Sequence, residues 1–315
     1  MDLTKAKLWF VTLSFAIFAL FAISSLQEND REWKKYQKEF LSMEMERGVH
    51  RDYSMGIKQV WNPQMGRTDR CITCHMGMED PDVQNPYTQN PYKSHPKVAM
   101  MKLHPTNKIG CTVCHEGQGQ ATSTEAAHGW VHAWDFPMHK QRGGVAFIQA
   151  SCTKCHAPDQ LPEGAEQLMA GRALWDKYGC VGCHMVQVIQ PDGGNQCPEL
   201  TGMGSKSESE FSNTHLFQHV ERISEHEYTT KYQWLYQHFM DPQKITPGDP
   251  PAIPATVMPN FQLTETEAKL LTLWVSSFRD AAKDNIPAQW VSRQPGKYDV
   301  TKPAGAKAKP KAKAK

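Results

Sequence analysis

The hydrophobic and polar positions divide the chain into an apolar N-terminal run, a polar middle and a C-terminal part with helical periodicity. Residues 8–26 carry no charge, and as a helix this 19-residue run would be about 28 Å long. That length spans the hydrocarbon core of a bilayer, so we expect a transmembrane anchor over residues 1–28. A secretory signal cleaved after Ala22-Ile23-Ser24 is the alternative, although the run is longer than a usual signal core.

The charges around this run predict its orientation. Lys5 and Lys7 precede it, and mixed charges follow between Glu28 and Lys35, which places the N-terminus in the cytoplasm. We therefore expect a single-pass protein of the cytoplasmic (inner) membrane with the bulk of the chain on the periplasmic side. The body of the chain is exported under either interpretation of the run.

Residues 29–60 are predicted to form a juxtamembrane helix and a linker. Trp33, Tyr36, Phe40 and Met43 recur at steps of three and four residues in a highly charged stretch that ends near Gly48. This spacing favours an amphipathic helix. A charged spacer helix with incidental aromatic residues would explain the pattern equally well.

Helical periodicity returns between residues 164 and 280. One predicted helix stops at Gly179 and has a face formed by Leu168, Gly171, Trp175 and Tyr178. Another begins at the capping box Thr264-x-x-Glu267 and has an apolar stripe formed by Ala268, Leu271, Val275 and Phe278. The predicted fold class is mainly α, with a loop-rich region over residues 61–160.

Composition and charge exclude several classes of protein. A chain of 315 residues with 39% hydrophobic and 22% charged residues is neither a polytopic membrane protein nor a collagen nor wholly disordered. Residues 302–315 contain six lysines and no acid, so the net charge of +2 becomes 2 − 6 = −4 for the rest, and we expect no nucleic-acid partner. The extension over residues 281–315 therefore ends in a Lys/Ala/Pro tail that we predict to be disordered.

Eight of the nine cysteines belong to four copies of one motif, in which two residues separate a cysteine pair and a histidine follows at once. The copies are Cys71-Ile-Thr-Cys74-His75, Cys111-Thr-Val-Cys114-His115, Cys152-Thr-Lys-Cys155-His156 and Cys180-Val-Gly-Cys183-His184. This is the attachment signature of c-type haem, because two thiols at this spacing reach both vinyl groups of one porphyrin and the histidine then lies beside the iron. A zinc site, a redox disulfide or an iron–sulfur cluster would not require a histidine after every pair. We expect four covalently attached haem c groups.

An iron that only carries electrons needs a sixth ligand, and five histidines between the first and third motifs could supply it. These candidates are His95, His104, His128, His132 and His139. Three haems need three of them, and spacing does not show which histidine serves which haem. His50 is a weaker candidate, and His215 with His219 lacks a third ligand in helical register, so we expect that pair on a solvated face.

The region around the fourth motif resembles the monohaem class I cytochrome c family along residues 164–280. The resemblance rests on the helix that ends before Cys180, on Met258-Pro259 and on the capped final helix. It implies Met258 as the distal ligand of the fourth haem. Thioether ligation raises the potential, so electrons would run from haems 1 to 3 toward haem 4. Cys197 stands where the family usually has glycine, and we expect a buried, inert thiol there.

The part that includes Asp69-Arg70-Cys71 and Gly110-Cys111, about residues 30–156, is similar to anchored multihaem subunits of bacterial quinol-oxidising cytochrome b and Rieske-type complexes. That resemblance implies such a complex as partner and a soluble carrier or terminal reductase as electron acceptor. We expect an electron relay with no substrate and no catalytic residue of its own. The alternative is a multihaem reductase of a small oxidant such as nitrite or hydroxylamine, which would need one haem with an open distal side.

Overall fold

A computed structural model describes most of the chain between residues 2 and 291. The described ranges are 2–50, 52–80, 85–128, 136–139, 141–142, 144–158, 160–187, 192–212, 219–220, 231–248 and 254–291. His132, His215 and the lysine-rich tail lie outside the described residues, so the predictions for them stay predictions.

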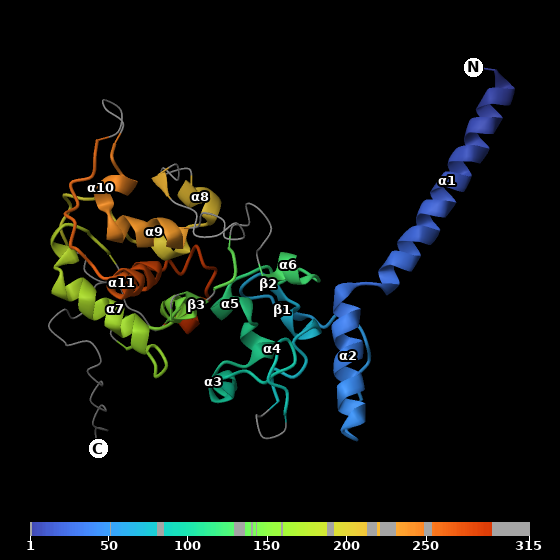
Figure 1. The fold of residues 1–315 in the computed structure, drawn as a ribbon, viewed down its shortest axis with the longest axis horizontal. Coiled ribbons are helices and arrows are strands. Elements are labelled where there is room, and N and C mark those ends of the chain that lie inside the picture. Colours follow the sequence, from blue (N-terminus) through green and yellow to red (C-terminus); the bar gives the residue numbers. More distant parts are fainter. Residues whose placement is uncertain are drawn as a thin grey trace.

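The chain begins with two consecutive helices. α1 (Leu3–Asn29) has no buried residue and projects away from the rest of the molecule, and α2 (Glu32–Glu46) follows after a bend at Asp30 (Figure 1). α1 is long and apolar enough to cross a membrane. α2 buries Trp33 and Phe40 against the body, together with Gln37 and Glu44, while most of its charged residues stay exposed or partly exposed. This confirms an amphipathic helix after the apolar one.

The middle of the chain consists of short elements joined by loops. A hairpin of β1 (Val60–Asn62) and β2 (Arg67–Asp69) places Val60 opposite Asp69. It is followed by η1 (Cys71–Thr73), α3 (Val98–Leu103), α4 (Thr106–Ile109), α5 (Thr112–His115) and α6 (Thr124–Ala127). The small core of this region contains Met65, Val113 and Ile286, so residues after the final helix pack back onto the middle part.

A second hairpin and a longer set of helices form the remainder. Its elements are β3 (Gln141–Arg142), β4 (Val145–Ala146), η2 (Phe147–Lys154), α7 (Glu166–Lys177), η3 (Cys180–Gly182), η4 (Met203–Ser205), α8 (Glu208–Ser212), α9 (Lys231–Met240), α10 (Pro242–Ile245), α11 (Glu265–Ser276) and η6 (Ala288–Trp290). α7, α9 and α11 pack together (Figure 1), and the predicted capping box of Thr264 and Glu267 is present at the start of α11. The fold is mainly α.

The main hydrophobic core joins the third motif to the C-terminal helices. It runs from Val145 and Phe147 through Trp175 to Trp274 and Phe278. The core therefore crosses the expected division between residues 160 and 164, and η2 and the C-terminal helices pack as one unit. α7 and α11 approach closely at Gly171, where an added Cβ would lie 2.3 Å from the carbonyl oxygen of Leu270.

Candidate cofactor-binding sites

Each of the four motifs folds into a single tight turn. In each, the histidine N–H donates to the carbonyl oxygen of the first cysteine, at 2.9 Å for His75, His115 and His156 and at 3.0 Å for His184. The turn brings the two cysteines and the histidine of each motif close together in space. All eight motif cysteines are free of disulfides. The turns therefore have the local shape that attachment of one porphyrin to each motif requires.

Three of the motif histidines face a second histidine from elsewhere in the chain. The ring centroids are separated by 6.4 Å for His75 and His128, by 6.0 Å for His115 and His95, and by 6.2 Å for His156 and His104. Two metal–nitrogen bonds of about 2 Å and ring radii of about 1.1 Å give a centroid separation of about 6 Å. Each pair therefore has the spacing at which one metal atom is bonded between two imidazoles.

Local hydrogen bonds orient the three histidines that face the motif histidines, namely His95, His104 and His128. The Nδ1 of His104 lies 3.1 Å from the carbonyl oxygen of Met100, and the Nδ1 of His95 accepts from the Lys97 N–H at 3.1 Å. His128 ends α6, and its N–H donates to the Thr124 carbonyl at 3.1 Å. A donating Nδ1–H, as His104 can direct at the Met100 carbonyl, leaves Nε2 unprotonated for a metal. In a neutral His95 ring the accepting Nδ1 instead places the proton on Nε2. Either contact fixes the direction of the ring.

Burial keeps the imidazoles of His75, His95, His115 and His156 in the neutral form. It lowers the pKa of His75 and of His115 to about 4, with a smaller contribution from a neighbouring histidine in each case. Burial also lowers the pKa values of His95 and His156. The rings are therefore neutral at pH 7, and neutral imidazole is the ligand state.

His139 has a different environment from the three paired histidines. It is buried, its Nδ1 lies 3.0 Å from the Tyr232 hydroxyl, and its ring meets the Tyr232 ring edge-on at 5.7 Å. Its backbone N–H donates to the His115 carbonyl at 2.7 Å. Among the five candidates the structure thus places three beside motif histidines, one beside a tyrosine, and leaves His132 undescribed.

The fourth motif has another arrangement. The Nδ1 of His184 lies 2.8 Å from the Pro198 carbonyl, and the Trp175 ring lies 6.4 Å from the imidazole. Met258 packs against the main core and is held by its backbone, which accepts from Gln243 Nε2 at 2.6 Å. Trp175 Nε1 is buried and has no hydrogen-bond partner among the described residues, which fits a polar edge of a bound cofactor at this site.

Cys197 lies on the loop over the fourth motif. Its N–H donates to the Cys183 carbonyl at 3.2 Å, and its thiol is half-buried rather than buried as we expected. The physical reason is that the loop lies at the surface, where Gln196, Pro198 and Cys183 are also exposed. Partial burial and the neighbouring Cys183 raise the pKa of the Cys197 thiol, so the thiol form prevails at neutral pH.

Asp69 joins the first two motifs. One carboxylate oxygen accepts from the Cys71 N–H at 3.2 Å, and the other accepts from the Cys111 and Thr112 N–H groups at 2.7 and 2.8 Å. The Asp69 carboxylate and the thiols of Cys71 and Cys111 lie within 4.8 Å of one another. Burial alone would raise the pKa of Asp69, but a hydrogen bond from the Cys71 thiol and those from the three backbone N–H groups hold it below its usual 3.8. The attachment points of the first two motifs are therefore neighbours.

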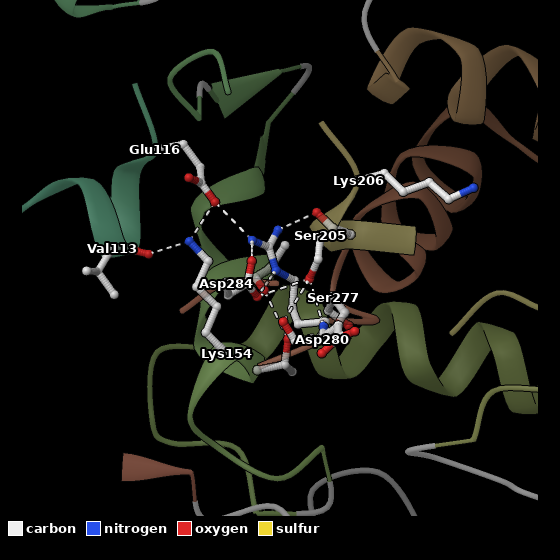
Figure 2. A network of polar contacts seen from close by, with 12 residues as sticks. Val113, Glu116, Lys154, Ser205, Lys206, Ser277, Asp280 and Asp284 are labelled. Atoms are coloured by element: carbon white, nitrogen blue, oxygen red, sulfur yellow. Dashed lines mark hydrogen bonds and ion pairs between the residues drawn. The ribbon is translucent and has the colours of Figure 1, made fainter. Parts of the chain in front are cut away.

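A buried network of charges joins the second and third motifs to the C-terminal helices (Figure 2). Lys154 Nζ donates to the Val113 carbonyl at 2.7 Å and to Glu116 Oε1 at 2.5 Å. Arg279 Nη2 donates to the same Glu116 oxygen at 3.1 Å and to Asp284 Oδ1 at 2.6 Å. Burial alone would raise the pKa of Glu116, but the charges of Lys154 and Arg279 hold it far below its usual value. The Glu116 carboxylate is therefore ionised.

Sequence reasoning did not find these connecting residues. Asp69 stands two residues before the first motif and Glu116 directly after the second, and an acid at these places was the only available signal. It does not identify Lys154 or Arg279 as partners.

Comparison with protein-family models, with curated proteins and with solved structures found no match to this chain.

Proposed function

We propose that the chain is a membrane-anchored tetrahaem cytochrome c that relays electrons. The observation that carries this proposal is the set of three histidine pairs with centroid separations between 6.0 and 6.4 Å. Haem attached to the first motif would be held by Cys71, Cys74, His75 and His128. Haem 2 would be held by Cys111, Cys114, His115 and His95. Haem 3 would be held by Cys152, Cys155, His156 and His104.

The fourth haem would be held by Cys180, Cys183 and His184, with Met258 as the distal ligand that the class I resemblance implies. Haem supplies the one-electron chemistry of its iron, and this chain supplies ligands, burial and orientation. The contact of His184 Nδ1 with the Pro198 carbonyl holds that imidazole in place and increases its basicity as a ligand. Thioether ligation at haem 4 would give it a higher potential than the three haems with two imidazoles.

The neighbouring attachment points support the order 1, 2, 3, 4 for the haems. Cys71 and Cys111 are close together beside Asp69, and Cys152 and Cys180 both contact the main core. Electrons would enter at haem 1, near the membrane helix, and leave at haem 4. We propose a quinol-oxidising cytochrome b or Rieske-type complex as donor and a soluble periplasmic carrier or a terminal reductase as acceptor, as the resemblance over residues 30–156 implies.

The histidine pairs also bear on the alternative of a reductase for a small oxidant. Such an enzyme needs an iron with an open coordination position, and a histidine opposite each of His75, His115 and His156 would occupy that position at haems 1 to 3. We therefore favour the relay over the enzyme.

The test is the ligand state of the purified full-length protein. We expect a mass that includes four haems, low-spin spectra and no carbon monoxide binding after reduction. Replacement of His95, His104 or His128 by Ala should open one haem of four to carbon monoxide, while His50→Ala, which changes an exposed histidine, should open none. Fewer than four haems, or carbon monoxide binding by the unmodified protein, would overturn the proposal.

A further inference from the structure

Helix α2 contacts the first motif through a buried amide. Gln37 is completely buried, and its Nε2 donates to the carbonyl oxygen of Thr73 at 2.9 Å and to that of Gly56 at 2.7 Å. The Gly56 N–H donates back to Gln37 Oε1 at 3.0 Å. Thr73 lies between the two cysteines of the motif, so α2 holds the turn that carries His75.

Five residues earlier, at its first residue, α2 contacts the segment that carries His128. Glu32 Oε2 accepts from the Thr124 N–H at 2.8 Å, and Glu32 Oε1 accepts from the Thr124 hydroxyl at 2.5 Å. Tyr36 donates its hydroxyl to Glu32 Oε1 at 3.0 Å and lies 3.1 Å from the Thr124 hydroxyl. The Thr124 carbonyl in turn accepts from the His128 N–H at 3.1 Å. A continuous series of hydrogen bonds thus runs from Glu32 to the His128 backbone.

Glu32 is ionised in this setting. Partial burial would raise its pKa, but the hydrogen bonds from Thr124 and Tyr36 lower it below the usual 4.5. Hydrogen bonds to a charged carboxylate are about twice as strong as those between neutral groups. α6 has only four residues, too few to be stable alone, so its position depends on such contacts.

We infer that Glu32 is a positioning residue that holds His128 in place as the distal ligand of haem 1. The inference rests on the proposed function. α2 would hold both sides of this haem, the proximal turn through Gln37 and the distal turn through Glu32. Since α2 follows the apolar helix after a bend of two residues, the ligation of haem 1 would depend on how the membrane anchor is seated.

The experiment measures carbon monoxide binding and the electron paramagnetic resonance spectrum of the full-length haem-loaded protein. In Glu32→Ala, loss of both bonds to Thr124 should raise the fraction of one haem that binds carbon monoxide by roughly tenfold or more. Glu32→Gln keeps one oxygen acceptor and should restore most of the low-spin signal. Glu46→Ala removes an exposed carboxylate from the same helix and should change nothing. Thr124→Val, which removes only the hydroxyl, should shift the signal in the same direction by less.

Combination variants identify the haem. Adding Glu32→Ala to His128→Ala should open no further haem, because both act on haem 1, whereas adding Glu32→Ala to His95→Ala should open a second one. If His128→Ala opens a haem and Glu32→Ala behaves like Glu46→Ala, the inference fails and the relay stands. If His128→Ala opens none, the proposed ligation of haem 1 fails first. An additional open haem in the Glu32→Ala/His128→Ala protein would also overturn the inference.

Discussion

Replacement of Lys154 by Met should destabilise the protein by several kcal/mol. Lys154 is 0% exposed and its partner Glu116 is 8% exposed. The substitution leaves the Val113 carbonyl without this donor and leaves the Glu116 carboxylate with one cation, Arg279. Removing one partner of a buried ion pair costs about 3–5 kcal/mol, because the remaining charge stays desolvated. We expect a loss in this range for the free energy of unfolding.

A surface ion pair of similar length provides the control. Lys283 Nζ lies 2.6 Å from Glu210 Oε1, but the two side chains are 46% and 42% exposed. Lys283→Met should therefore cost less than about 1 kcal/mol. The two variants differ in the burial of the pair and share the same chemical change.

The assay is urea unfolding of the haem-loaded protein, followed by tryptophan fluorescence and compared at equal detergent and salt concentrations. The double variant Lys154→Met/Glu116→Gln should regain part of the loss, since it removes the unpaired charge as well. If Lys154→Met shifts the midpoint no more than Lys283→Met, the network does not hold the second and third motifs to the C-terminal helices. A gain in stability for Lys154→Met would refute the reasoning outright.

Three other predictions follow from particular residues. Acidification should weaken the fold, because the pKa values of Asp69 and Glu116 in the folded chain lie below their usual 3.8 and 4.5. As the pH falls through those usual values, the unfolded chain binds more protons than the folded chain does. The melting temperature of the unmodified protein should therefore fall more steeply below about pH 4.5 than that of Glu116→Gln. Gly171→Ala should lower the melting temperature by forcing α7 and α11 apart, a cost of about 1–3 kcal/mol, while Gly182→Ala, where an added Cβ meets open space, should not. Met258→Ala should open haem 4 to carbon monoxide and lower its potential in a redox titration; an unchanged potential would remove Met258 from the ligand set.

Sequence periodicity was sufficient for the elements with local signals. The apolar run predicted α1, the spacing of Trp33 and Phe40 predicted α2, and the capping box at Thr264 predicted the start of α11. Each of these helices is indicated by residues that lie close together in the sequence, often three to seven positions apart. One short stretch therefore contains all the information that predicts the helix. The packing of residues before 160 on the C-terminal helices has no such local signal, because the main core joins Val145 to α11, more than a hundred residues later.

The histidine pairs show where sequence information ends. The candidate pool included His95, His104 and His128, but the pairing crosses the chain order: His128 faces His75, and His95, which precedes the second motif, faces His115. The number of residues between two motifs does not predict which histidines come together, since loops of very different lengths close at a similar cost in conformational entropy. The contact of Glu116 with Arg279 spans 163 positions and has no local signal at all.

The residues inside and beside the first three motifs connect these motifs to one another and to neighbouring helices. The two positions between the cysteines of a motif would not bond to a haem, and several of them link the motif to the rest of the chain. Thr73 of the first motif is bound by Gln37 of α2, and Thr112 of the second motif donates its N–H to Asp69 beside the first. Lys154 of the third motif donates to the carbonyl of Val113 in the second.

The last link leaves the third motif in the opposite direction. The Thr153 hydroxyl donates to the Ser277 carbonyl at the end of α11 at 2.6 Å, and both residues are buried. Thr153 and Lys154 are adjacent, so one dipeptide bonds to the C-terminal helices on one side and to the second motif on the other. Because buried polar groups must find fixed partners, these contacts leave little freedom for one motif to move relative to the next. The proposed relay would need such rigidity, since electron transfer between haems depends on their spacing being kept.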